Sequence, residues 1–264
     1  MLSPVVSTAT GTGLPRYNPL PVVQTTSHSP YGLPIVDNCR TCKLRNESFF
    51  CGLSKPTLEA LEPIKHATSY PEGAIVFVEG QVPRGVYVLC QGRVKLMTTN
   101  SDGKSFILKI AQPGEILGLH SVMNGEPSEL TVETLQPSQL TFIGREDFLR
   151  FLKTHGDACL HAAQHLSRDC VSAYEVIRSI GLSHSASEKL ARLLLQWSAD
   201  GQAINGQVRL KLALTHEEIA QLIGTSRETV TRMLGDFRKK RILELTGSTL
   251  LIHNLAELER LAAC

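Results

Sequence analysis

One stretch near the C-terminal end constrains the fold more than any other: HEEIAQLIGTSRETVTRMLGDF, residues 216–237. Its apolar residues stand where two helices that meet at a tight turn need them. Gly224 suits the turn because glycine tolerates a positive φ. The residues expected to face inward, with a small alanine where the helices cross, are Ile219, Ala220, Ile223, Val230 and Met233. The stretch therefore predicts a helix-turn-helix.

The ends and the outer face of these two helices indicate what they bind. Each helix is expected to begin with a capping box, formed by Thr215 with Glu218 and by Thr225 with Glu228. An Arg–Glu–x–x–x–Arg pattern on a helix that can enter the major groove favours base reading, and a solvated helical hairpin is the alternative. The candidate DNA-binding residues are Thr225, Ser226, Arg227, Glu228, Thr231 and Arg232.

Bulk composition limits the class of protein. A chain of 264 residues with 42% hydrophobic content can form one large or two ordinary domains. The net charge of only +2 requires any DNA contact to be local, and residues 238–241 are a dense basic run that fits phosphate contact or a solvated helix end. Neither a membrane span of about twenty apolar residues nor a secretion signal is evident. We therefore expect a cytoplasmic protein without membrane contact.

Cysteines gather near the start of the chain. Residues 1–38, rich in Pro, Ser and Thr, predict a disordered arm. The arm is followed by Cys39, Cys42 and Cys51 in a C-x2-C-x8-C arrangement, which can bring three sulfurs to one metal. Cys90 is a further cysteine outside a later helical segment. A metal or redox site is one interpretation, and a set of free thiols is the other.

From Tyr70 onward, short apolar runs alternate with glycine-bearing turns. This spacing predicts a jelly roll or β-roll, which together with the cysteines occupies residues 39–154 of an α+β chain. The expected strands are Ile75–Val78, Val86–Leu89, Val94–Met97, Phe106–Ile110, Ile116–Leu119, Thr131–Leu135 and Gln139–Ile143.

A long helix is expected within residues 155–183, from about Asp157 to Ile180. Its apolar residues recur at alternating spacings of four and three, which is typical of a seam between two copies in a homodimer. The seam residues are Cys159, Ala163, Leu166, Cys170, Ala173, Ile177 and Ile180. His161 and His165 are four residues apart, but without a carboxylate motif they are interpreted as surface or interface residues rather than metal ligands.

Residues 184–264 complete the predicted organisation. Ser185 or Ser187 can cap a helix over Glu188–Trp197, and a strand is expected at Val208–Leu212. The helix-turn-helix is followed by two apolar runs that flank Gly247-Ser248, a hairpin that serves as a wing. A short closing helix follows, so this unit is a predicted winged helix-turn-helix.

The order of these parts resembles the CRP/FNR family of bacterial transcription regulators over residues 39–260. The similarity rests on YVLCQGRVKL, on PGEILGL and on LTHEEIAQLIGTSRETVTRML. It implies that Arg227, Glu228 and Arg232 read bases, that dimers bind inverted half-sites in double-stranded DNA, and that RNA polymerase is a partner.

The resemblance also bears on the signal. Family members that bind cyclic nucleotides grip the phosphate with Arg-Ser or Arg-Thr, whereas Ser128-Glu129 stands here, and the place of their ribose carboxylate looks like Gly118. A carboxylate repels an anion, so cyclic nucleotide binding is disfavoured. The cysteines resemble the FNR branch, whose iron–sulfur cluster senses oxygen or nitric oxide. Here the spacing between the second and third cysteines is longer, and Thr141 stands in place of the fourth cysteine. Cys90 is then either a substitute ligand or a buried thiol.

The resulting hypothesis is a DNA-binding regulator, not an enzyme, switched by a 4Fe-4S cluster on Cys39, Cys42, Cys51 and Cys90. In one alternative the same regulator responds to a small molecule in the β-roll, or to thiol or zinc chemistry. In the other the jelly roll is a cupin-like metalloenzyme, which needs clustered histidines. His120 is the only histidine between Tyr70 and Ile143, which argues against it.

Overall fold

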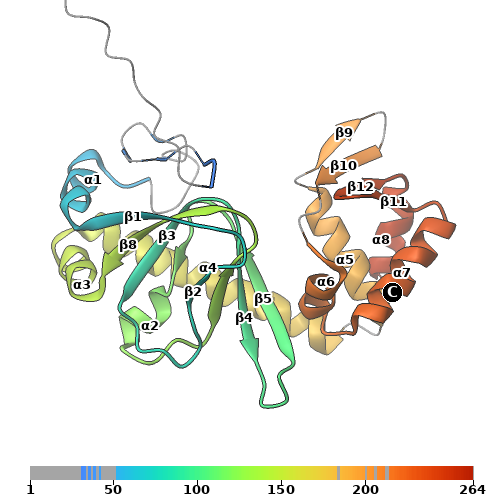
Figure 1. The fold of residues 1–264 in the computed structure, drawn as a ribbon, viewed down its shortest axis with the longest axis horizontal. Coiled ribbons are helices and arrows are strands. Elements are labelled where there is room, and N and C mark those ends of the chain that lie inside the picture. The colour runs from blue at the N-terminus through green and yellow to red at the C-terminus, as the bar shows by residue number, and fades with distance from the viewer. Residues whose placement is uncertain are drawn as a thin grey trace, which may run out of the picture.

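The computed structural model describes residues 31–33, 35, 36, 38, 39, 42, 52–182, 185–199, 201–204, 207–211 and 214–263. An N-terminal β-roll packs along one long helix, α4 (Gly156–Leu182), which leads to a C-terminal helical domain with its own small sheet (Figure 1). Most of the predicted N-terminal arm and Cys51 lie outside the described residues. Within the described residues, no helix combines the length and hydropathy that a membrane span requires.

The β-roll consists of two antiparallel sheets with strand orders β1-β8-β3-β6 and β2-β7-β4-β5. Their strands are β1 (Lys65–Tyr70), β2 (Ile75–Phe77), β3 (Gly85–Gln91), β4 (Val94–Thr99), β5 (Ser105–Ala111), β6 (Ile116–Leu117), β7 (Thr131–Thr134) and β8 (Ser138–Gly144). Apolar residues from both sheets fill the space between them: Leu89, Val94, Ala111, Leu117, Val132 and Leu140. The predicted fold class is confirmed.

Two elements of the β-roll differ from the sequence prediction. Strand β1 was missed because KHATSY lacks apolar alternation, and it is held by pairing with β8 along its whole length. The strand predicted over Ile116–Leu119 ends at Leu117, since Gly118 adopts a left-handed φ of 76° and starts helix α2 (Leu119–Asn124). A strand cannot continue through that backbone conformation.

Helices α1 (Lys55–Leu61) and α3 (Arg145–Thr154) pack with the first half of α4 on one side of the β-roll. Ala158 and Ala162 of α4 are fully covered, and Leu166 is half-buried against the same core. A short 3-10 turn, Glu62–Ile64, leads from α1 into β1. This packing joins the long helix firmly to the β-roll.

The start of α4 carries a pH-dependent contact. The Thr57 hydroxyl lies 2.9 and 2.8 Å from the two carboxylate oxygens of Asp157, and the Ser54 amide donates to the same carboxylate at 3.2 Å. Burial raises the pKa of Asp157, but these hydrogen bonds together outweigh it and lower the pKa to about 2. The folded state therefore holds the ionised form in preference to the protonated form.

Because the folded pKa of Asp157 lies below its unfolded value of about 3.9, this stabilisation is complete above that value and is lost as the pH falls toward 2. We expect Asp157→Asn to lower the free energy of unfolding at pH 6 by up to about 1 kcal/mol, since solvent screens these contacts. The difference from the wild type should shrink toward pH 2 in urea denaturation. Asp102→Asn, in the exposed β4–β5 turn, is the control; an equal effect there would contradict the assignment.

The C-terminal domain begins with α5 (Ala186–Ser198). Ser185, one of the two residues predicted to cap this helix, is its N-cap. It continues with β9 (Gln202–Ile204), β10 (Gln207–Lys211), α6 (His216–Ile223), α7 (Arg227–Lys239), β11 (Leu243–Thr246), β12 (Thr249–Ile252) and α8 (Leu255–Ala263), and its sheet order is β11-β12-β10-β9. The predicted wing is the β11–β12 hairpin. The core of the C-terminal domain contains Leu190, Leu194, Ile219, Val230, Phe237 and Leu250.

Candidate DNA-binding motif and sensor region

Helices α6 and α7 form the predicted helix-turn-helix. The capping box at α6 is confirmed: the Glu218 amide donates to the Thr215 hydroxyl at 3.2 Å, and the Thr215 amide donates to Glu218 Oε2 at 2.9 Å. Gly224 ends α6 in the left-handed conformation with a φ of 67°. The Thr225 amide then donates to the Ala220 carbonyl at 2.9 Å and closes the turn. The local geometry is the one that the sequence predicts.

The capping box predicted at α7 is wrong by one residue. Ser226, not Thr225, caps this helix, because its hydroxyl accepts the Thr229 amide at 3.3 Å. Ser226 is still extended, with a φ of −94° and a ψ of 154°, so the helix can start only at Arg227. Thr225 is half-buried in the turn. The pattern of residue types could not place the cap, since both Thr225 and Ser226 are good capping residues.

The outward face of α7 carries the candidate base-reading residues. Arg227, Glu228, Thr231 and Arg232 are all exposed, while Val230, Met233, Leu234 and Phe237 bury the opposite face. Hydrogen bonds from its own backbone amide and from Ser226, together with the nearby Arg227 charge, outweigh a small desolvation effect and lower the pKa of Glu228. The carboxylate is therefore held ionised, which suits acceptance of a hydrogen bond from the amino group of cytosine.

The basic run at the end of α7 is also exposed. Arg241 has a left-handed φ of 56°, and the Ile242 amide donates to the Phe237 carbonyl at 2.9 Å. This arrangement ends the helix in the way that a left-handed residue commonly does. It turns the chain into the wing and leaves the lysine and arginine side chains facing solvent.

In the β-roll, the place expected for a cyclic nucleotide is nearly filled. A cavity of about 20 Å³ remains among Phe77, Tyr87, Gly118, Ser121 and Ser128. The rings of Phe77 and Tyr87, which line this cavity, stack with centroids 5.8 Å apart. Such a space holds about one water molecule.

Glu129 is the second residue of the pair that stands where the resemblance places the phosphate-gripping Arg-Ser or Arg-Thr. His120 Nδ1 lies 2.6 Å from one of its carboxylate oxygens, and the Ser121 hydroxyl donates to the other at 3.0 Å. Burial raises the pKa of Glu129, but hydrogen bonds from its backbone amide, His120 and Ser121 outweigh it and lower the pKa. Glu129 therefore carries a negative charge, and its hydrogen-bond partners come from its own chain.

Cys39 and Cys90 each contact a residue of the sheet that contains β1, β8 and β3. Lys65 Nζ donates to Cys39 Sγ at 3.2 Å. Cys90 Sγ lies 3.2 Å from the Thr141 hydroxyl, so β3 places a thiol beside the position where the family's fourth cysteine is replaced. No described cysteine is in a disulfide. Cys42 is half-buried, and the placement of Cys51 falls outside the described residues.

The segment that leads into Cys39 is tied to this sheet as well. The Val36 amide donates to Gln139 Oε1 at 2.8 Å, and the Gln139 side-chain amide donates back to the Val36 carbonyl at 2.9 Å. Gln139 is two residues before Thr141 on β8, so both side chains point to the same face of the sheet. That face therefore carries both Cys90 and the segment preceding the N-terminal cysteines.

A polar cluster that the sequence did not predict joins the β-roll to α4. His165, interpreted above as a surface or interface residue, is only 5% exposed, and its Nε2 accepts the Ile116 amide at 3.2 Å. Asp169 lies 3.0 Å from His165 Nδ1 and 3.1 Å from Lys109 Nζ, and Lys109 also pairs with Glu115. The ligand atoms of Glu115, His165 and Asp169 lie within 4.8 Å of one another, but the Lys109 ammonium already supplies a cation to both carboxylates.

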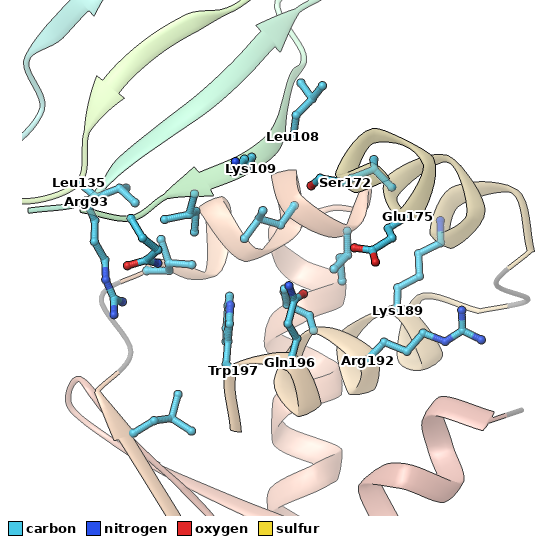
Figure 2. Close-up of a pocket in the computed structure, with 18 of the residues that line it drawn as sticks. Arg93, Leu108, Lys109, Leu135, Ser172, Glu175, Lys189, Arg192, Gln196 and Trp197 are labelled. Carbon is cyan, nitrogen blue, oxygen red and sulfur yellow. The ribbon is translucent and has the colours of Figure 1, made fainter. Parts of the chain in front are cut away.

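A groove of about 1040 Å³ lies between the β-roll, α4 and the C-terminal domain. Figure 2 shows Arg93, Leu135 and Lys109 of the β-roll on one side, and Gln196 and Trp197 of α5 opposite them. Ser172 and Glu175 of α4 close one end (Figure 2). No local pattern could have predicted this groove, because it forms between segments far apart in the chain.

Comparison with known proteins agrees with both domains. Residues 67–155 match the family model of the cyclic nucleotide-binding domain, and residues 188–261 match that of the Crp-like helix-turn-helix domain. Together with the exposed face of α7, this pair of domains defines a DNA-binding transcription regulator. The chain belongs to the CRP/FNR family of such regulators. The relatives found in the comparison are transcription regulators and not enzymes. The cupin-like alternative is thereby excluded.

Relatives in several bacteria span most of the chain. The CRP-like cAMP-activated global transcriptional regulator of Mycobacterium tuberculosis is 26% identical over 220 residues, which cover 83% of this chain and 98% of that protein. The global nitrogen regulator of Synechocystis is 26% identical over 198 residues, covering 74% and 87%. The structure of FixK2 from Bradyrhizobium japonicum shares the fold, with a TM-score of 0.67 and 22% identity over 76% of this chain and 98% of that one.

Proposed function

We propose that this protein is a cytoplasmic, homodimeric regulator that reads an inverted-repeat operator with Arg227, Glu228 and Arg232 and acts on transcription through RNA polymerase. The observation that carries the proposal is the exposed polar face of α7, mounted on a closed and well-packed helix-turn-helix. A symmetric pair of such helices reads half-sites about one helical turn, or a multiple of it, apart.

The operator is tested by selecting duplexes that the protein retains from a random DNA library and sequencing them. An inverted repeat with half-sites at helical spacing is the expected result. Recovery of single half-sites, or of no preferred sequence, would contradict dimeric reading. A transcription assay with purified RNA polymerase on the selected operator then shows whether the protein activates or represses.

The proposed dimer surface is the face of α4 that points away from the β-roll. Apolar side chains there are unusually exposed, at 58% for Leu160, 55% for Val171, 60% for Tyr174 and 63% for Ile177. An apolar stripe of this kind is typical of an interface. We therefore propose that the same face of a second copy covers it, as the two-fold symmetry of a homodimer allows.

The predicted seam agrees with this face only in part. Cys159, Ala163, Cys170, Ala173 and Ile177 are exposed. Leu166 instead packs against its own β-roll, and the side chain of Ile180 lies outside the described residues. Three of the four large exposed apolar side chains lie one position further along, at Leu160, Val171 and Tyr174. One position corresponds to a rotation of about 100° around the helix.

We expect the double substitution Val171→Asp and Tyr174→Asp to weaken dimerisation by roughly 30-fold or more, because it introduces unpaired charges into an apolar interface. Analytical ultracentrifugation measures the dimer dissociation constant. Met123→Asp, which changes an exposed apolar residue of α2, is the matched control. A double variant that stays as dimeric as the wild type would show that α4 is not the interface.

For the signal, we propose a redox-sensitive iron–sulfur cluster held by Cys39, Cys42, Cys51 and Cys90. Support comes from the Cys90 thiol beside Thr141 and from the Val36–Gln139 pair, which ties the cysteine segment to the same sheet face. Thiolates are the usual ligands of such clusters, and a cluster would supply sensitivity to oxidants. The chain itself supplies the thiolate ligands, and the Val36–Gln139 pair attaches the segment before Cys39 to the β-roll.

The experiment is anaerobic purification followed by an absorption spectrum and analysis of iron, sulfide and zinc. The same measurements are made on Cys51→Ser and on Cys90→Ser. Cys170→Ser, at an exposed position of α4, is the control. Iron and sulfide that disappear in the first two variants and persist in the control support the cluster. Zinc in their place would support a zinc site, and metal-free protein with unchanged DNA binding would remove both proposals.

We further infer that a cyclic nucleotide is not the signal, although relatives respond to cAMP as their names state. The β-roll cavity of about 20 Å³ cannot admit one, and the Glu129 carboxylate stands where an anion would bind. Isothermal titration with cAMP and cGMP should show no binding. A measured affinity in the micromolar range would instead favour the alternative of a small-molecule sensor.

A further inference from the structure

A buried lysine connects the two domains. Lys95 of β4 is 8% exposed, and its ammonium lies 3.0 Å from Glu133 on the neighbouring strand β7 and 3.2 Å from Glu218 of α6. Burial lowers the pKa of Lys95, but the two carboxylates outweigh it and raise the pKa above its ordinary value. Lys95 is therefore charged, and a buried charge is stable only while its partners remain in place.

Glu218 serves two structures at once. Its Oε2 accepts the Thr215 amide at 2.9 Å and so caps the first helix of the DNA-binding motif. Its other oxygen, Oε1, accepts the Lys95 ammonium. The carboxylate that starts α6 thus also attaches α6 to the β-roll, across 123 residues of sequence. We call Lys95, Glu133 and Glu218 the Lys95 latch.

A second contact supports the same attachment. The Phe106 ring of β5 lies 3.7 Å from the point where a Cβ on Gly224 would stand, so the β-roll also touches the turn of the motif. Helix α6 and strand β5 run side by side (Figure 1). The hairpin of β4 and β5 therefore contacts two adjacent parts of the motif, the first turn of α6 and the turn before α7.

The parts of the motif that the hairpin contacts are among those that a helix-turn-helix presents to DNA. The first helix crosses the DNA backbone, and helix N-termini bind its phosphates. We propose that the Lys95 latch holds the motif in a low-affinity state, in which the β-roll occupies the side of α6 that the DNA backbone requires. Release of the latch frees the N-terminal end of α6 and permits binding.

The chain contains its own reporter of this release. Trp197 is the only tryptophan and lines the groove between the β-roll and the C-terminal domain (Figure 2). Separation of the two domains opens that groove to solvent. Quenching of Trp197 fluorescence by acrylamide therefore measures domain release without any DNA.

The experiment compares Lys95→Met and Glu218→Gln with the wild type. Glutamine keeps the side-chain oxygen that caps α6 but loses the charge that holds Lys95. We expect stronger Trp197 quenching in both variants. We also expect an increase of about 5- to 150-fold in affinity for an operator duplex selected with the wild-type protein, measured by fluorescence anisotropy. Lys104→Met removes the same charge from the exposed β4–β5 turn and should change neither readout.

Circular dichroism melting checks that each variant is folded, and Glu133→Gln replaces Lys95→Met if the latter is not. Folded variants with unchanged or reduced operator affinity would overturn the proposal. A reduced affinity would mean that the contact aligns the motif for DNA instead of withholding it. An equal gain in Lys104→Met would trace the effect to net charge and would equally overturn it.

Discussion

Replacement of Arg232 by alanine is expected to relax the preference for one base pair of each half-site by about 1–3 kcal/mol. The Arg232 side chain is exposed on α7, and its neighbours Val230 and Met233 anchor that helix in the core. The substitution therefore removes a side chain without moving the backbone. Arginine can donate two hydrogen bonds to the major-groove edge of guanine, and alanine can donate none, so discrimination is lost at that position alone.

The measurement is a panel of operator duplexes in which each base pair is replaced in turn, titrated with wild type and Arg232→Ala. Lys239→Ala is the control, because Lys239 is exposed at the end of α7 in the basic run that we expect to contact phosphate. It should weaken all duplexes by a similar factor and reduce the salt dependence of binding. If Arg232→Ala behaved like Lys239→Ala, Arg232 would contact the backbone and not a base.

Replacement of Gly92 by alanine is expected to destabilise the β-roll by about 2–4 kcal/mol, because two costs add. The φ of Gly92 is 93°, which L-residues rarely adopt. An added Cβ would also meet Ser138 Cα at 2.7 Å, and backbone cannot give way as a flexible side chain can. Ser138 is itself fully buried, so the contact cannot relax toward solvent.

Urea denaturation followed by circular dichroism measures this loss as a lower midpoint at unchanged slope. Gly103→Ala is the matched control, since Gly103 has a φ of 78° but open space around its Cα. It should cost only the backbone part, about 1–2 kcal/mol. Equal losses in the two variants would show that the contact with Ser138 contributes nothing.

The motif that reads DNA was predictable because its determinants are local. Gly224 fits a left-handed turn, and Thr215 with Glu218 caps α6 within four residues. The spacing of apolar residues in the sequence predicts the inner face of α7, and the residues assigned to that face are buried in the structure. The same holds for most strands of the β-roll, where apolar runs bounded by glycines match the observed elements to within a residue or two.

Features that depend on partners elsewhere in the chain were missed or misplaced. Strand β1 has no pattern of its own and exists because β8 supplies its hydrogen bonds. The seam along α4 followed the heptad spacing, yet packing against the β-roll turned Leu166 inward and left Val171 and Tyr174 exposed. His165 was interpreted as a surface or interface residue, but it is buried and accepts a hydrogen bond from the Ile116 amide of β6.

The amino-acid sequence by itself determined the two domains, the long helix between them and the polar residues exposed on α7, since each follows from periodicity, capping and turn chemistry within about twenty residues. Only the tertiary structure decided how these parts act on one another. It placed Cys90 beside Thr141 and Lys95 between Glu133 and Glu218. Such contacts join residues far apart in the sequence, and burial makes them strong because water no longer competes for the same charges and hydrogen bonds.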